Sequence, residues 1–183
     1  MPKTVAVFVG SLRKGSINRQ YARVLERLAG DRLAFRFVEI GDLPLYNDDL
    51  WQEGTGPDAV MRMKAQVEAC DAVLIVTPEY NRNVPGLLTN ALDWCSRPYG
   101  NSSLMGKPSA CTGASPGAIG TAAAQTHLKA AMDALGLCAM GFPEVYLQWK
   151  PDDYDDATCK NDATRTFLQG FVDAFATHVE RFA

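Results

Sequence analysis

The chain has 183 residues, of which 47% are apolar and 21% are charged, and its formal net charge is −3 at pH 7. This length and balance are typical of a globular domain, so we expect residues 1–183 to fold as a single domain. The slightly acidic charge, without a basic cluster, argues against a nucleic-acid partner.

Membrane insertion and metal chemistry have equally little support. No apolar run approaches the roughly 20 residues that span a bilayer, and the first residues lack the layout of a signal peptide. The five cysteines are scattered, with no C-x-x-C pair, and do not suggest a disulfide framework. The two histidines, His127 and His178, lie far apart and form no metal-ligand cluster with cysteine. We therefore expect a reduced, cytoplasmic protein.

The first half of the chain alternates strand and helix patterns. It opens with a continuous run of branched and aromatic residues, typical of a strand buried on both faces. A Gly/Ser-rich loop, an amphipathic helix, a second strand, a long loop and a second helix follow. In order, these segments are Thr4–Val9, Gly10–Asn18, Ile17–Ala29, Leu33–Ile40, Gly41 to about Pro57, and Asp58–Ala69.

The second half repeats the alternation, again starting with a strongly apolar strand. In order, the strand candidates are Asp71–Val76, Pro108–Thr112, Leu137–Met140 and Glu144–Leu147. Helices are predicted over Gly86–Cys95, Thr121–Leu135 and about Asn161–Phe182, the last preceded by a polar acidic stretch, Pro151–Asp156. Phe167, Phe171 and Phe175 fall four apart on the last helix, which indicates core packing.

This order predicts a doubly wound α/β sandwich with a five-stranded parallel sheet in the order 2-1-3-4-5. In such sheets, ligands bind beyond the carboxyl ends of the strands. Three loops should meet there: Gly10–Asn18, Pro78–Asn83 and Gly113–Gly120. The candidate site is therefore a pocket between these loops.

The first of these loops reads Gly-Ser-Leu-Arg-Lys-Gly-Ser-Ile-Asn and leads from a strand into a helix. Unpaired N–H groups and the helix dipole favour an anion at such a helix start. Ser11, Ser16 and Asn18 add neutral hydrogen-bonding groups, and Arg13 adds a positive charge. The loop therefore predicts a phosphate site.

Two better-known phosphate loops do not match. A P-loop requires lysine directly after its second glycine, but Ser16 follows Gly15 here, which argues against a nucleoside triphosphatase. The Rossmann pattern G-x-G-x-x-G is missing from this loop, and the glycines of Gly113–Gly120 are spaced as in a turn that enters a helix.

Hydroxyls, an amide and backbone N–H groups suit one terminal phosphate without a metal. In the second loop, Pro78 and Tyr80 offer a flat wall against which a planar ring could lie. A phosphate end and a ring end together describe FMN.

At this point the sequence resembles the NADPH-dependent FMN reductase family of the flavodoxin-like superfamily, which includes bacterial quinone and chromate reductases and azoreductases. The matching motifs are G-S-L-R-x-x-S-x-N from Gly10, T-P-E-Y-N from Thr77 and P-G-x-L-x-N-A-x-D-W from Pro85. Further matches follow at Ser96–Pro98, Gly106–Pro108 and Gly113–Gly120, so the resemblance extends to about residue 150.

The resemblance implies bound FMN and a set of contacts to it. The residues expected at the phosphate end are Ser11, Arg13, Ser16, Ile17 and Asn18. The residues expected along the ring are Pro78, Glu79, Tyr80 and Asn81, with Ser115 and Gly117 closing the third side. Asn90, Asp93 and Trp94 are interpreted as packing or interface residues.

The reaction that the family implies is transfer of hydride from NADPH or NADH to flavin, and then of electrons to a small acceptor. Quinones, azo compounds, chromate and free flavin stay open as acceptors. No Ser-His-Asp or Cys-His arrangement is found, so no catalytic side chain is assigned, although Arg13 and Arg82 are candidates for contacts with nicotinamide nucleotide phosphates. The family also implies a homodimer or homotetramer in which the neighbouring subunit helps to wall the site.

Two other classes of protein remain possible for this sequence. A flavodoxin-type electron carrier shares the fold and FMN, but we would expect a Thr-rich first loop and a strongly acidic face. A regulatory binding module would use the fold without redox chemistry. Turnover of NAD(P)H and uptake of FMN separate the three classes.

Overall fold

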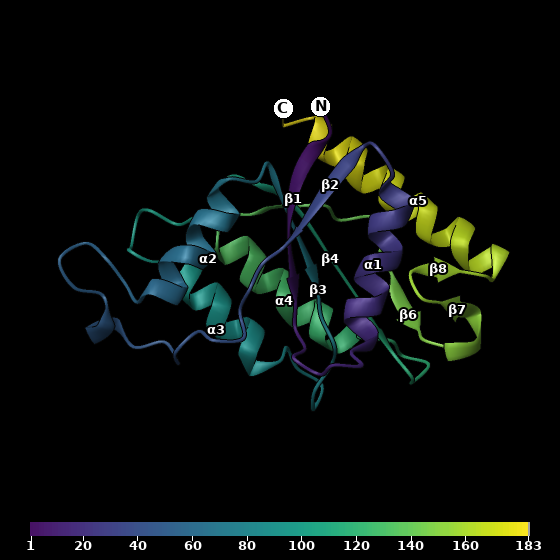
Figure 1. The fold of residues 1–183 in the computed structure, drawn as a ribbon, viewed down its shortest axis with the longest axis horizontal. Coiled ribbons are helices and arrows are strands. Elements are labelled where there is room, and N and C mark those ends of the chain that lie inside the picture. Colours follow the sequence, from purple (N-terminus) through teal and green to yellow (C-terminus); the bar gives the residue numbers. More distant parts are fainter. Residues whose placement is uncertain (183) are drawn as a thin grey trace.

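The computed structural model describes residues 1–182 and shows a parallel sheet between two layers of helices (Figure 1). The sheet strands are β1 (Lys3–Val9), β2 (Leu33–Phe37), β3 (Ala72–Val76), β4 (Pro108–Ser115), β5 (Cys138–Ala139) and β6 (Tyr146–Gln148). The helices are α1 (Ile17–Ala29), α2 (Asp58–Glu68), α3 (Gly86–Cys95), α4 (Ala122–Ala134) and α5 (Asp162–Glu180). The strand order β2-β1-β3-β4-β5 confirms the predicted topology.

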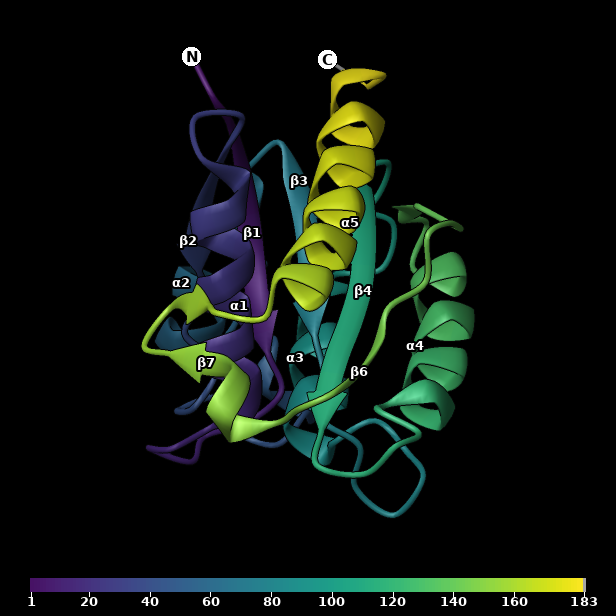
Figure 2. The same ribbon diagram turned by 90° about the vertical axis from the view of Figure 1, so that its right-hand side faces the viewer.

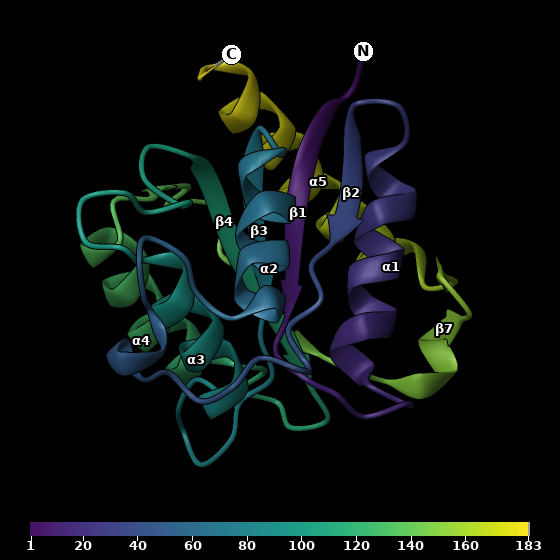
Figure 3. The same ribbon diagram turned by 60° about the vertical axis from the view of Figure 1, so that its left-hand side comes forward.

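Each face of the sheet has its own core. Along β1, Val5, Val7 and Val9 pack with α1 and α5, whereas Ala6 and Phe8 pack with the opposite layer. That opposite layer consists of α2, α3 and α4 (Figures 2 and 3). Burial on both faces is the reason why β1 and β3 read as continuous apolar runs.

The helix ends follow local chemistry. Ser16 caps α1 by accepting a hydrogen bond from the Arg19 N–H, and Asn161 caps α5 by accepting one from the Thr164 N–H. Gly30, with φ of 52°, ends α1. No helix within residues 1–182 combines the length and the apolarity needed to cross a bilayer.

Several predicted boundaries are wrong. Strand β2 ends at Phe37, before the predicted Ile40, and β4 continues to Ser115 instead of stopping at Thr112. The extension of β4 is explained by pairing, because Gly113–Ser115 lie in register with β6. The last strand position is divided: β5 pairs with the start of β4, and β6 pairs with its end.

The C-terminal part also departs from expectation. The acidic stretch contains a short 3-10 helix (Pro151–Asp153) and the first strand of a small hairpin, β7 (Tyr154–Asp155) with β8 (Thr158–Cys159). Phe171 and Phe175 of α5 are buried, but Phe167 is exposed because Leu168 takes the core position at that turn. The predicted three-phenylalanine core stripe is therefore only partly correct.

The long loop from residue 41 to 57 projects away from the sheet as an arm (Figure 1). Its base is tied to α3, because the Pro44 carbonyl accepts hydrogen bonds from Asn90 Nδ2 and Trp94 Nε1, both at 2.9 Å. Tyr46 donates its N–H to Asn90 Oδ1 at 2.7 Å and packs edge-on against the Trp94 ring. Asn90 and Trp94 are thus packing residues, as predicted, whereas Asp93 is exposed.

Candidate functional site

The three predicted loops meet in a shallow pocket of about 130 Å³ beyond the carboxyl ends of β1, β3 and β4. Register explains the meeting, since Val9 of β1 pairs with Val76 of β3 and Val76 pairs with Thr112 of β4. The pocket is lined by Ser11, Arg13, Ser16, Ile17, Asn18, Pro78, Glu79, Tyr80, Ala114, Ser115 and Pro116. The predicted Asn81 and Gly117 are not part of this wall.

The start of α1 forms one end of the pocket. The N–H groups of Ile17 and Asn18 lie in the first turn, where a helix offers no acceptor for them. The Ser16 hydroxyl oxygen accepts from the Arg19 N–H at 3.2 Å, which leaves its own proton available to a ligand. With the Ser11 hydroxyl and the Arg13 guanidinium on the wall, this end supplies donors and positive charge.

Asn18 lines the pocket, but its side chain is occupied elsewhere. Its Nδ2 donates to the Ala114 carbonyl at 2.9 Å, and its Oδ1 accepts from the Ala114 N–H at 2.9 Å. The buried side-chain amide of Asn18 therefore links α1 to the end of β4 by two hydrogen bonds to the backbone of Ala114. The side chain of Asn18 is thereby occupied within the protein, whereas its N–H belongs to the first turn of α1, where the helix offers no acceptor.

The second loop is a tight turn. Tyr80 and Asn83 exchange two backbone hydrogen bonds, and Asn81 and Arg82 between them have φ of 54° and 62°, the pattern of a type I′ turn. Asn81 occupies the tip of this turn, which is why it lies outside the pocket wall. Pro78 and Tyr80 border the pocket itself.

Glu79 connects this turn to α4. Its carboxylate, only 8% exposed, accepts from Arg82 Nη1 at 3.0 Å and from the Ala124 N–H in the first turn of α4 at 3.1 Å. A helix N-terminus stabilises a carboxylate placed there. Arg82, a candidate for nucleotide phosphates, thus already balances the charge of Glu79.

The third side is the extension of β4. The Ser115 hydroxyl donates to the Gly120 carbonyl at 2.6 Å, and this hydrogen bond closes the loop between β4 and α4. The Gly117 carbonyl lies 3.2 Å from the same hydroxyl, and Gly117 does not line the pocket. Ala114 and Pro116 line the pocket without having been predicted; the run of small residues from Gly113 to Ser115 was the available sign that the backbone itself forms a wall.

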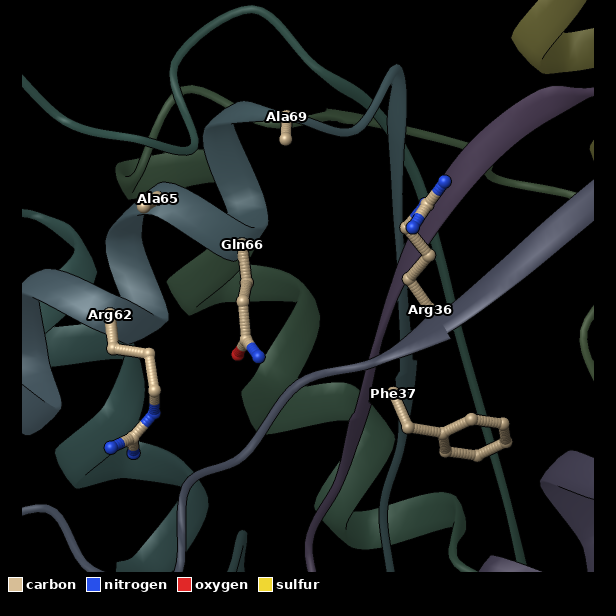
Figure 4. A pocket seen from close by; sticks show the side chains of 6 residues that line it. All are labelled: Arg36, Phe37, Arg62, Ala65, Gln66 and Ala69. Atoms are coloured by element: carbon tan, nitrogen blue, oxygen red, sulfur yellow. The ribbon is translucent and has the colours of Figure 1, made fainter.

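A larger hollow, about 610 Å³, lies between β2 and α2 (Figure 4). Two of its polar side chains already have protein partners: Arg62 pairs with Asp42 at 2.7 Å, and Gln66 Oε1 accepts from the Glu39 N–H. Arg36 and Arg62 stand apart on opposite sides of the hollow (Figure 4). Without groups that converge on one point, the hollow does not have the character of a reaction site.

Burial disfavours thiol chemistry at Cys95 and Cys111. Burial raises the pKa of Cys95 to about 12 and that of Cys111 to about 11. Both side chains are therefore protonated at neutral pH and unsuited to act as nucleophiles.

Known proteins match the chain over nearly its whole length. The model of the NADPH-dependent FMN reductase family matches residues 3–150. A quinone reductase of Pseudomonas putida is 50% identical over 177 residues, which cover 97% of this chain and 95% of that protein. A 2-hydroxy-1,4-benzoquinone reductase of a Burkholderia species is 45% identical, with 98% and 97% covered.

Solved structures agree with this match. FerB, a flavoenzyme NAD(P)H:(acceptor) oxidoreductase from Paracoccus denitrificans, is 51% identical, superposes with a TM-score of 0.94 and is covered over 98% of both chains. A flavodoxin from the domain Archaea, at 11% identity and a TM-score of 0.58, shares the fold alone. The family match and the full-length relatives lead to one conclusion: the chain belongs to the NADPH-dependent FMN reductase family.

Proposed function

We propose that the pocket beyond β1, β3 and β4 is the FMN site of an NAD(P)H-dependent oxidoreductase that reduces quinones or similar small acceptors. The observation that carries this proposal is the meeting of a helix start rich in donors with a flat wall in one pocket. Family membership supports both FMN and NAD(P)H, and the names of the relatives support quinones.

The residues present fit the cofactor. The first-turn N–H groups of Ile17 and Asn18, the hydroxyls of Ser11 and Ser16, and the Arg13 guanidinium would hold the phosphate. These are the neutral and cationic donors that a phosphomonoester requires. They need no metal to complete them.

The ring end is built differently. Pro78, Glu79 and Tyr80 would border the ring on one side, and Ala114, Ser115 and Pro116 on the other. Asn81 and Gly117 would contribute indirectly: Asn81 shapes the turn between Tyr80 and Asn83, and Gly117 belongs to the loop between β4 and α4. Because the side chains of Glu79 and Ser115 bond to protein atoms, backbone groups are the available partners for the polar edge of the ring.

The bound flavin supplies the chemistry, by accepting hydride from NAD(P)H and reducing the acceptor. For a quinone, the hydride and one proton from solvent yield the hydroquinone and NAD(P)⁺. The pocket walls would hold and orient the ring. No side chain is assigned a proton in this scheme.

A spectrum of the purified protein tests the proposal. Flavin absorbance should appear with FMN, bleach on anaerobic addition of NADPH, and recover on addition of a quinone. Substitution of Arg13 by Ala should weaken FMN binding, whereas Arg165→Ala, a change to an exposed arginine of α5, should not. A protein that takes up no FMN, or whose flavin NAD(P)H cannot reduce, would exclude this function; in the second case a flavodoxin-type carrier becomes the better description.

We also infer a homodimer, or a homotetramer built from it, with the arm as a contact. Leu45 and Leu50 of the arm and the nearby Tyr99 are large apolar side chains left exposed, and aromatic and apolar groups are typical of interface cores. Sedimentation should show a dimer at micromolar concentration that Leu50→Glu weakens. The matched change Phe142→Glu, at an exposed site outside the arm, should leave the dimer intact, and a monomeric wild-type protein would rule the inference out.

We also propose that the protein is located in the cytoplasm. This proposal rests on the free cysteines and on a co-substrate, NAD(P)H, that is made inside cells. Cell fractionation with antibody against the untagged protein tests it, and recovery in an extracellular or envelope fraction would contradict it.

A further inference from the structure

Helix α4 lacks a side-chain cap within its own residues, 121–134. Thr121, at the N-cap position, makes no capping hydrogen bond, and the first turn of the helix contains no acidic residue. The Thr121 hydroxyl instead accepts from Gln125 Nε2 at 2.8 Å. In α1 and α5, by contrast, Ser16 and Asn161 cap the helix. The positive end of α4 therefore depends on a group from elsewhere in the chain.

The carboxylate of Glu79 is that group. Its Oε2 accepts from the Ala124 N–H at 3.1 Å, across 45 residues of sequence, and its Oε1 accepts from Arg82 Nη1 at 3.0 Å. The side chain of Glu79 is only 8% exposed, so its charge requires partners within the protein. Each carboxylate oxygen has one such partner.

The same contacts fix the turn of residues 80–83 against α4. Asn83 Oδ1 lies 3.1 Å from His127 Nδ1, one helical turn after the contact of Glu79, so the attachment is double. The turn is also strained, because Arg82 adopts φ of 62°, a conformation that most residues with a side chain disfavour. The ion pair with Glu79 helps to offset this strain. Without the Glu79 carboxylate, we expect the turn to loosen.

We propose that Glu79 is a positioning residue of the flavin site. Its carboxylate holds the ring-side turn on the start of α4, and its charge, balanced by Arg82, sets the potential at which the bound ring is reduced. This inference rests on the proposed function, because Glu79 and Tyr80 line the pocket at the end proposed for the ring. Reduction adds electron density to the ring, so a nearby anion opposes it and a nearby cation favours it.

Affinity for two flavins tests the positioning. The apoprotein is titrated with FMN and with riboflavin, which carries the same ring without the phosphate. Glu79→Gln should weaken the binding of both flavins by the same factor, about 5- to 10-fold, because only the ring end of the pocket is disturbed. Arg13→Ala, a change at the phosphate end, should weaken the binding of FMN alone.

The reduction potential of the bound flavin tests the charge. It is measured without oxygen, against a reference dye, during reduction by dithionite. In Glu79→Gln the Arg82 cation loses its partner, so the potential should become more positive than in the wild type. Arg82→Asn tolerates the positive φ but leaves the carboxylate unbalanced, so it should make the potential more negative. The double variant should lie between the two single variants.

The variant Asn161→Ala separates these effects from a general loss of stability. It removes the cap of α5, whose residues 162–180 lie outside the pocket wall. We expect it to lower the Tm by about 2–4 °C, as Glu79→Gln should. The flavin affinities and the reduction potential of Asn161→Ala should nevertheless equal those of the wild type.

Failure of the inference differs from failure of the proposed function. If Glu79→Gln lowers the Tm but leaves the riboflavin affinity unchanged, Glu79 is only a helix cap and the inference is wrong. It is equally wrong if Glu79→Gln and Arg82→Asn shift the potential in the same direction or not at all. The wild type would still bind FMN and be reduced by NADPH in those cases. If the wild-type apoprotein binds neither flavin, the proposed function is wrong and the inference falls with it.

Discussion

At the scale of single residues, lying in the pocket and binding the ligand are separate properties. Asn18, Glu79 and Ser115 all line the pocket, yet the polar atoms of each side chain form hydrogen bonds to the backbone of the protein. A motif can place a residue on a loop, because loop positions follow from local patterns. It cannot say where a side-chain amide or carboxylate points, since that depends on strands and helices distant in sequence.

Asn18 offers a direct test of this separation. Asn18→Ala would leave the buried N–H and C=O of Ala114 unpaired, and should cost about 2–4 kcal/mol of unfolding free energy. Asn18→Asp keeps the acceptor but sets a carboxylate against the Ala114 carbonyl and near the phosphate. It should therefore weaken FMN binding more than the alanine variant does. Urea unfolding and FMN titration measure the two effects, and equal FMN affinities in both variants would argue against a phosphate at the start of α1.

Asp71 illustrates a residue whose role is purely structural. Its carboxylate accepts hydrogen bonds from the hydroxyl and the N–H of Thr4, and these bonds lower its pKa below the usual value of 3.8. The carboxylate is preferred in the folded state, so its contribution to stability is complete above the unfolded-state pKa and disappears as the pH falls through the folded-state pKa. Asp71→Asn should cost about 1 kcal/mol at pH 7, with the gap closing below about pH 4. Urea unfolding from pH 7 to pH 3 measures this gap, and a constant difference would contradict the assignment.

At the scale of elements, the helices and the strands of the sheet could be predicted, but the ends of the strands β2 and β4 could not. Strands β1 and β3 are marked by continuous apolar runs that require cover on both faces. The extension of β4 to Ser115 depends instead on β6, which lies more than 30 residues further along the chain. The hairpin of β7 and β8 contains only two residues per strand, too few to produce a periodic pattern.

The loop between β4 and α4 contains a matched pair of glycines. A Cβ on Gly120 would lie 2.6 Å from the carbonyl carbon of Tyr146, and its φ of 62° disfavours other residues. Gly120→Ala should therefore cost at least about 2 kcal/mol and loosen the pairing of β6 with β4. At Gly117, the nearest atom to an added Cβ is Ser115 Oγ at 3.7 Å, so Gly117→Ala should change stability by less than about 0.5 kcal/mol. Thermal unfolding compares the two, and similar losses in both would mean that the close approach of β6 is not the cause.

At the scale of the whole molecule, the alternation of strands and helices was enough to predict the sheet order and the edge at which the pocket lies. The nine-residue loop Gly10–Asn18 then predicted a phosphate end within this pocket. What no local pattern indicated is the connection between the turn at residues 80–83 and α4, because the side chains of Glu79 and Asn83 reach partners on α4 more than 40 residues further along the chain. The path of the arm could not be predicted from the sequence either, because the hydrogen bonds from Asn90 and Trp94 of α3 to the Pro44 carbonyl join residues more than 40 positions apart.

The stability of the whole molecule should respond to the cofactor in a way that reports which end holds the phosphate. A ligand that binds only the folded state, present at 100 times its Kd, adds about 2.7 kcal/mol. For a chain of this size, that should raise the Tm of the apoprotein by roughly 5–11 °C with FMN. Riboflavin has the same ring but no phosphate, so at equal concentration it should give a much smaller shift, and Arg13→Ala should reduce the FMN shift towards the riboflavin value. Equal shifts with FMN and riboflavin in the wild type would show that the start of α1 does not recognise the phosphate, because binding would then be driven by the ring alone.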